Sequence, residues 1–182
     1  MKLIAITQPY AIDGENVLIR YLLANGYDIV HLRKPDIGYC RDLLEMLTPA
    51  ERSHIVVHDY YPLYEEYALR GVHLNRNFAS YPVNYRGTRT RSCHSFEEVV
   101  KYKDECDYLF LSPIFDSISK IGYHSQFSHD ELQNASDMGV IDDKVIALGG
   151  VTLDKINYLQ SLNFGGVAMM GAICDTLNHK LR

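Results

Sequence analysis

Four histidines stand near the ends of consecutive apolar runs in this 182-residue chain. They are His31 in IVHLR, His58 in IVVHDY, His73 in GVHLN and His94 in RSCHS. Because histidine titrates near neutral pH, one such ring can take a proton from carbon and return it elsewhere. A single histidine is more often a hydrogen-bonded structural residue than a catalyst. Four at successive strand ends favour acid–base chemistry. We expect His94 to be catalytic, and His31, His58 and His73 to bind the substrate or its phosphate.

Two further apolar runs end in glycine, in VIALGGV (145–151) and GVAMMGAI (166–173). Without a Cβ atom, glycine lets its amide approach an anion closely, and a helix beginning near Thr152 adds a favourable dipole. A purely structural role in turns is the alternative. We predict a phosphate-binding site made by Gly149, Gly150, Met170 and Gly171.

Arg33 lies two residues after His31, so in an extended strand both side chains share one face. We expect that face to point toward the mouth of the fold. An arginine directed inward needs an anion, which Asp36 or a substrate phosphate would supply.

The segment SPIFDSISKIGYHSQF (112–127) combines Ser117, Ser119 and Lys120. Hydroxyl groups and an ammonium on a loop suit a phosphate or pyrophosphate lid. An ordinary serine-rich surface loop explains the same composition equally well.

A metal site made of the histidines with Asp59 is conceivable, but no HxH or HxxxH spacing supports it. The four cysteines, at positions 40, 93, 106 and 174, form no CxxC pair. We expect them to be reduced thiols that serve packing.

Apolar runs bounded by turn residues predict eight strands, over residues 3–7, 29–33, 55–59, 71–74, 90–94, 108–114, 145–150 and 166–171. Helices are expected over 15–25, 40–47, 61–70, 96–105, 129–138 and 153–162. Ser95 with Glu98, and Ser128 with Glu131, have the spacing of capping boxes, and Thr152 is expected to cap its helix. Eight alternating units favour an α/β fold of the closed (β/α)₈ TIM barrel type over an open doubly wound sheet.

Two units of this small barrel look stunted. Residues 75–87 contain a proline and no helical period where the fourth helix belongs, and the last nine residues allow only two turns of an eighth. Missing helices leave apolar barrel wall uncovered. We therefore expect a second copy of the chain to cover it in a homodimer.

Composition is that of an ordinary globular protein, with 47% hydrophobic and 23% charged residues. The length suggests a single domain over residues 1–182. No apolar segment approaches the length of a membrane span, and the N-terminal run is too short for a signal peptide, so we expect a cytoplasmic protein. A net charge of −5 without a long basic run argues against nucleic acid as a partner and leaves small molecules.

In the order of its motifs the chain resembles the thiamine phosphate synthase / TenI family of small (β/α)₈ barrels. IVHLRKP is similar to the family's QxREK strand, IVVHD to its IINDR-type strand, and GVHL to its GVHLGQ. RSCHSFEEV is similar to its SxHS segment, CDYLFLSPIFDSISK to its ADYvgxGPiFpTxTK, and VIALGGV to its pvxAIGGI. The similarity runs through nearly the whole chain.

For the synthase branch, the resemblance implies that hydroxymethylpyrimidine diphosphate loses pyrophosphate while its methylene is captured by the nitrogen of a thiazole phosphate. Cations and Mg²⁺ would hold the leaving group. The implied roles are pyrophosphate binding by Arg33, Lys120, Ser117 and Ser119, one Mg²⁺ ligand from Asp59, and thiazole phosphate binding by Gly149, Gly150 and Gly171.

Several departures from the synthase pattern point to the other branch. His31, Lys34 and Pro35 replace Gln, Glu and Lys of QxREK, and no carboxylate follows GVHL within the next few residues. TenI-type relatives lack synthase activity and, without a metal, aromatise a thiazole carboxylate phosphate with the histidine that matches His94. We therefore favour a tautomerase slightly, with a synthase or a non-catalytic thiazole phosphate binder as alternatives.

Overall fold

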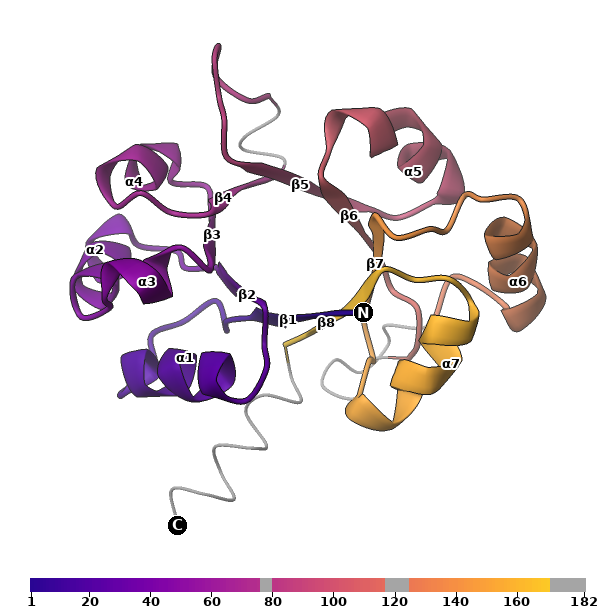
Figure 1. Cartoon of the computed structure of the whole chain (residues 1–182), viewed down its shortest axis with the longest axis horizontal. Coiled ribbons are helices and arrows are strands. Elements are labelled where there is room, and N and C mark those ends of the chain that lie inside the picture. Colours follow the sequence, from indigo (N-terminus) through magenta and orange to yellow (C-terminus); the bar gives the residue numbers. More distant parts are fainter. Residues whose placement is uncertain (76–79, 117–124, 171–182) are drawn as a thin grey trace. The chain divides into compact units, whose positions relative to one another are not determined.

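The computed structural model describes residues 1–75, 80–116 and 125–170. Its strands follow one another from β1 to β8 in a closed barrel, which confirms the predicted (β/α)₈ fold (Figure 1). The strands are β1 (Lys2–Ile6), β2 (Ile29–Leu32), β3 (Ile55–His58), β4 (Gly71–Leu74), β5 (Thr88–Cys93), β6 (Tyr108–Leu111), β7 (Val145–Leu148) and β8 (Gly166–Met169). The α-helices are α1 (Glu15–Ala24), α2 (Ile37–Glu45), α3 (Pro49–Arg52), α4 (Tyr61–Glu66), α5 (Phe96–Tyr102), α6 (His129–Asp137) and α7 (Ile156–Ser161); the 3₁₀ turns are η1 (Lys103–Glu105) and η2 (Leu153–Lys155).

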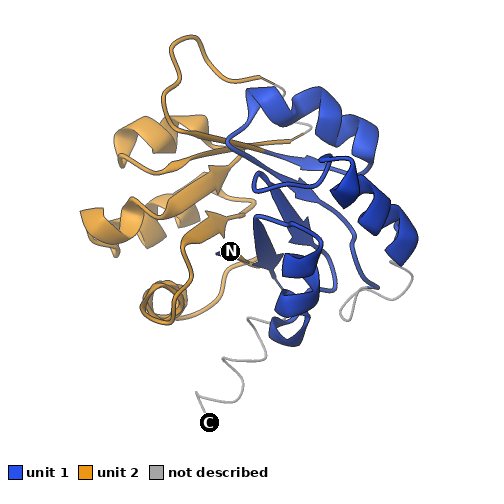
Figure 2. Ribbon diagram, turned by 45° about the vertical axis from the view of Figure 1, so that its right-hand side comes forward, with its two compact units in different colours: residues 1–3, 91–182 blue, residues 4–90 orange. Residues whose placement is uncertain are grey.

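The chain divides into two compact units, coloured separately in Figure 2. Unit 2 is Ile4–Thr90, in which β1 to β4 pair in parallel. Unit 1 comprises Met1–Leu3 and Arg91–Arg182, in which β6, β7 and β8 pair in parallel. The single domain over residues 1–182 stays a prediction.

The core of unit 2 follows from the strand sequences. Every residue of β2, β3 and β4 is buried, as expected for parallel strands covered on both faces. Helix α1 buries Leu18 and Leu22, four residues apart, together with Ile19. This spacing places the three side chains on one face, which covers apolar surface.

The core of unit 1 is built in the same way, with β6 and β8 buried throughout. The predicted capping box of α6 is present, because Ser128 accepts from the Glu131 amide and Glu131 accepts from the Ser128 amide. Two other predicted caps differ. Ser95 caps α5, but the Glu98 carboxylate accepts from the amide of His94, one residue earlier.

The cap predicted at Thr152 is the second difference. Its side chain makes no capping hydrogen bond, and the chain continues as the short 3₁₀ turn η2 before α7. The favourable dipole predicted beside Gly150 stays a prediction.

All eight predicted strands exist, but several end one to three residues early. β2 stops at Leu32 and β7 at Leu148, so the polar and glycine residues that follow belong to the loops. Helix α2 begins at Ile37 because Asp36 accepts from the Tyr39 amide and caps it. Helix α3 was not predicted.

The connection between β4 and β5 contains no helix in its described part, residues 75 and 80–87. There Tyr85 is buried, stacks on Tyr81 with ring centroids 5.0 Å apart, and packs against Tyr64 of α4. Residues 76–79, and those of the predicted short eighth helix, lie outside the described residues. The homodimer stays a prediction.

Among the helices described here, each is too short or too polar to cross a membrane. Cys40, Cys93 and Cys106 are buried free thiols, as predicted, and Cys174 lies outside the described residues. Burial raises the pKa of Cys40 and Cys93 to about 12 and that of Cys106 to about 11. These three thiols are therefore unreactive packing groups.

Candidate active site

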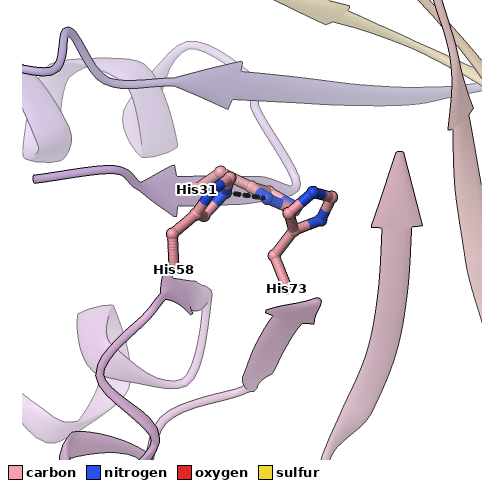
Figure 3. A group of neighbouring side chains, drawn as sticks. All are labelled: His31, His58 and His73. Carbon is pink, nitrogen blue, oxygen red and sulfur yellow. Dashed lines mark hydrogen bonds between the residues drawn. The ribbon is translucent and has the colours of Figure 1, made fainter. Parts of the chain in front are cut away.

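Three of the four predicted histidines form one buried cluster in unit 2 (Figure 3). His31 of β2, His58 at the end of β3 and His73 of β4 are 0%, 7% and 3% exposed. His58 and His73 are direct partners in the strand register, and His31 pairs with Val56, one layer deeper. Neighbouring strands thus direct the three rings to one place.

The rings contact one another closely. His31 Nδ1 lies 3.0 Å from His58 Nε2, and the His58 and His73 rings stack with centroids 4.3 Å apart. His73 Nδ1 also lies 3.4 Å from the hydroxyl of Thr90. We call His31, His58 and His73 the histidine cluster.

Burial sets the protonation state of this cluster. Desolvation lowers the pKa of His31 well below 6.5, and the charge of His73 acts in the same direction. Desolvation also lowers the pKa of His58, with further contributions from His31 and Arg33. At neutral pH both rings are neutral and keep an imidazole lone pair.

Arg33 is exposed because β2 ends at Leu32, so the strand alternation predicted from His31 does not extend to it. Its backbone is fixed instead by the hydroxyl of Thr7, which accepts from the Arg33 amide at 3.0 Å. Arg33 thus presents its charge at the end of the strand while His31 lies inside.

Lys34 is not available to a ligand, although it is the nearest lysine to the family's QxREK position. Its Nζ lies 2.6 Å from Glu15 Oε1, and both side chains are 0% exposed. The same ammonium donates to the carbonyls of Gln8 and Tyr10, while Tyr39 donates to Glu15 at 2.8 Å. Lys34 therefore fastens the loop between β1 and α1.

Asp59 is the carboxylate proposed for Mg²⁺. It follows His58 with φ of 65°, and its Oδ1 accepts from the side-chain Nδ2 of Asn75 at 2.5 Å. Mg²⁺ requires several oxygen ligands in octahedral geometry. Residues 75–78, after β4, are Asn, Arg, Asn and Phe and add no carboxylate. Among the described residues, Asp59 and Asn75 therefore supply fewer oxygen ligands than Mg²⁺ requires.

His94 has a different environment from the histidine cluster. It lies in unit 1, directly after β5, and is exposed. Its Nδ1 lies 2.9 Å from the carbonyl oxygen of Ser112, whose amide in turn donates to Cys93. A carbonyl only accepts, so Nδ1 carries the hydrogen and Nε2 of the neutral ring carries the lone pair.

Backbone contacts hold His94 on both sides. The Glu98 carboxylate accepts from its amide at 2.6 Å, and Ser95 begins α5 immediately afterwards. The position of the ring is therefore fixed at its backbone and at Nδ1, with Nε2 as the remaining ring nitrogen. This arrangement suits a general base.

Gly149 and Gly150 both have positive φ, 93° and 61°. A Cβ atom at Gly149 would lie 2.8 Å from Pro113 Cα, and one at Gly150 would lie 2.3 Å from the Asp116 carbonyl oxygen. The turn thus requires glycine for its own packing, as the structural alternative proposed. Neither amide donates to a backbone carbonyl among the described residues, so phosphate binding there stays a prediction.

Of the remaining predicted site residues, the structure describes Met170. Met170 follows β8 and is partly exposed. Ser117, Ser119, Lys120 and Gly171 lie outside the described residues, and their proposed roles stay predictions.

Sequence reasoning singled out the four histidines but missed the buried Lys34–Glu15 pair. It also did not anticipate that Ser112 would fix the tautomer of His94. The only sequence signal for the buried pair was an acidic residue at the start of α1, which also fits ordinary helix capping.

A closed (β/α)₈ barrel with polar side chains at the carboxyl ends of its strands defines a class of enzymes that build their sites there. Within that class, residues 3–173 match the family described as thiamine monophosphate synthase. The chain therefore belongs to the thiamine monophosphate synthase family, a family of thiamine biosynthesis.

Individual relatives agree with this assignment. The thiamine-phosphate synthase of Salinibacter ruber is 24% identical over 177 residues, covering 88% of this chain and 75% of that protein. The crystal structure of a thiamine phosphate pyrophosphorylase from Bacteroides thetaiotaomicron is 36% identical, with a TM-score of 0.88, and covers 100% of this chain and 89% of that one. A second thiamine phosphate pyrophosphorylase, from Pyrococcus furiosus, shares the fold at 19% identity and a TM-score of 0.70, covering 94% and 86% of the two chains.

Proposed function

We propose that this chain is a thiazole tautomerase, which aromatises a thiazole carboxylate phosphate by moving a proton. The observation that carries the proposal is the hydrogen bond from His94 Nδ1 to the Ser112 carbonyl, at 2.9 Å. This bond fixes the ring tautomer and leaves Nε2 as the proton acceptor. The reaction requires no metal.

In the proposed reaction, His94 Nε2 takes a proton from a carbon of the non-aromatic ring, and the imidazole becomes imidazolium. The carbonyl oxygen of Ser112 stabilises this cation, because it already accepts the hydrogen bond from His94 Nδ1–H. The same proton then returns to another carbon, so no net charge is gained. The exposed position of His94 gives the substrate access to Nε2.

The Gly149 and Gly150 amides, which belong to the same unit as His94, are proposed to hold the phosphate of the substrate. Neither amide donates to a backbone carbonyl among the described residues. Anion binding by Arg33 stays a prediction from the sequence.

The test is an aromatisation assay on purified protein in the presence of a chelator. We expect catalysis by the native chain and its loss in His94→Ala, with binding of the phosphate ligand retained. His129→Ala is the matched control, because this exposed histidine also belongs to unit 1 and its Nδ1 hydrogen bonds the Tyr158 hydroxyl. Equal rates for the native chain and His94→Ala would refute the assigned role.

A second proposal is thiamine phosphate synthase activity, which the names of the relatives support. Mg²⁺ belongs to this proposal, in which it would neutralise charge on the pyrophosphate. Pyrophosphate release that depends on Mg²⁺ would establish this activity in place of the tautomerase. Binding of thiazole phosphate with neither activity would identify a non-catalytic binder.

A further inference from the structure

The histidine cluster contains three ring nitrogens, one from each residue, that all lie within 4.8 Å of one another. The three residues come from adjacent paired strands of unit 2, so the arrangement is built into the sheet rather than into a loop. Figure 3 shows the three rings directed toward one another, with a dashed line for the hydrogen bond between His31 and His58. Such convergence of three imidazoles is the donor set of a transition-metal centre.

We propose that His31, His58 and His73 bind one first-row transition-metal ion, with Zn²⁺ as the reference ion, through one nitrogen each. The site has three protein ligands and leaves a fourth position for water or an anionic ligand. Imidazole nitrogen suits Zn²⁺, Co²⁺, Ni²⁺ and Cu²⁺, whereas Mg²⁺ prefers oxygen. The preferred metal of this chain therefore differs from the Mg²⁺ that its family implies.

Metal binding requires the rings to turn, because His58 and His73 stack with an interplanar angle of 22° and an imidazole lone pair lies in the plane of its ring. Tetrahedral ligands about 2.1 Å from a metal are separated by about 3.4 Å. His31 Nδ1 and His58 Nε2 are already 3.0 Å apart, and the largest separation in the set is within 4.8 Å. Rotation about the side-chain bonds would have to bring the three nitrogens to this spacing.

The protons also balance. In the metal-free cluster one ring donates its hydrogen between His31 Nδ1 and His58 Nε2. Each neutral imidazole has a second nitrogen, so this hydrogen moves to the nitrogen that faces away from the metal. Binding then needs no net loss of protons.

Groups around the cluster hold the rings in place. The Thr90 hydroxyl lies 3.4 Å from His73 Nδ1 and orients that ring. Asp59, next to His58, accepts from Asn75, which follows Leu74 at the end of β4. This bond joins the ends of β3 and β4 directly beside two of the three ligands.

The inference does not depend on the proposed reaction, because the three rings belong to unit 2 and His94 belongs to unit 1. The experiments below therefore measure metal binding and need no assay of the proposed aromatisation. The alternative is a purely structural stack of hydrogen-bonded rings, which would bind no metal.

The first experiment uses the native chain after removal of metals with a chelator. Titration with Co²⁺ should give visible absorption that saturates at one equivalent, and Zn²⁺ should displace it. In NMR spectra that report histidine ring nitrogens, Zn²⁺ should shift the signals of His31, His58 and His73. The signals of His54 and His129 should stay unchanged, and Mg²⁺ should shift none of the three.

A variant then assigns the ligands. His73→Phe keeps an aromatic ring stacked on His58 but removes a nitrogen donor, and should weaken Zn²⁺ binding by about 100-fold or more. His54→Phe is the matched control, since His54 lies outside the cluster and hydrogen bonds the Asp28 carbonyl. It should bind Zn²⁺ like the native chain.

Three results would overturn the site. They are the absence of a Co²⁺ spectrum in the native chain, equal Zn²⁺ affinity in folded His73→Phe, and Zn²⁺-induced NMR shifts confined to other histidines. If His73→Phe fails to fold, the native-chain titration and its NMR assignment still decide the question.

Discussion

The histidine cluster and His94 show how the same residue type, placed near neighbouring strand ends, acquires different chemistry. The cluster rings are buried and contact one another, whereas His94 is exposed and hydrogen bonds a backbone carbonyl. Burial makes neutral imidazoles that suit metal binding and contributes to the core. Exposure with one nitrogen fixed makes a proton acceptor. The environment, more than the residue type, decides between the two.

The largest expected difference is in stability. His31→Ala removes a fully buried ring and leaves His58 without its hydrogen-bond partner, so the free energy of unfolding should fall by about 2–5 kcal/mol. His94→Ala removes an exposed ring and should change it by about 0.5 kcal/mol or less. Urea denaturation of metal-free protein measures both, and similar losses for the two variants would contradict the contrast.

Activity should show the reverse order. His94→Ala should lower the aromatisation rate by about two orders of magnitude or more, because the base is lost, while ligand affinity stays nearly unchanged. Rate and affinity are measured separately by single-turnover kinetics and by titration with the phosphate ligand. A loss of affinity without a loss of rate would assign His94 to binding instead.

The pH dependence of stability should distinguish the cluster further. The folded pKa of His31 and of His58 lies below the unfolded value of 6.5, so the unfolded chain binds more protons as pH falls. In metal-free protein, stability should therefore decrease below about pH 6.5, by up to about 1.4 kcal/mol per pH unit for each ring. Unfolding free energies measured at decreasing pH from 7.5 test this sign.

Two variants refine that measurement. His31→Phe should reduce the slope by the contribution of one ring, and His129→Phe, which replaces an exposed ring, should leave it unchanged. Stability that rose on acidification would show that the cluster is protonated in the folded chain.

The smallest predicted effect concerns the support of His94. Glu98→Ala removes the carboxylate that accepts from the His94 amide, and should cost about 1 kcal/mol in stability and up to about tenfold in rate. Glu131→Ala removes the corresponding contact to the Ser128 amide in α6 and should cost similar stability without a rate effect. Equal rates in the two variants would show that Glu98 serves only the helix.

The strands could be predicted well because parallel strands buried on both faces read as continuous apolar runs. Their ends could not, since residues such as Arg33 and Gly149 directly follow an apolar run but lie outside the strand. Helix α3 was missed because Pro49 resembles a helix breaker. In the structure Pro49 lies in the first turn of α3, where a backbone N–H has no partner within the helix. It directly follows Thr48, which forms a capping box with Glu51.

The candidate site could be predicted only in part. Motif rules for metals describe ligands within one element, so they do not detect His31, His58 and His73, which come from three strands. Strand register brings these residues together, and register depends on tertiary pairing rather than on local sequence. Likewise, nothing in the order of residues places the Ser112 carbonyl beside His94, 18 positions away.

The buried pair of Lys34 and Glu15 has a consequence for ionic strength. Dissolved salt screens charges that water can reach, such as the exposed pair of Arg41 and Glu66. It does not reach two side chains that are 0% exposed. The loop between β1 and α1 should therefore keep its conformation at salt concentrations that are high enough to screen the ion pairs on the surface.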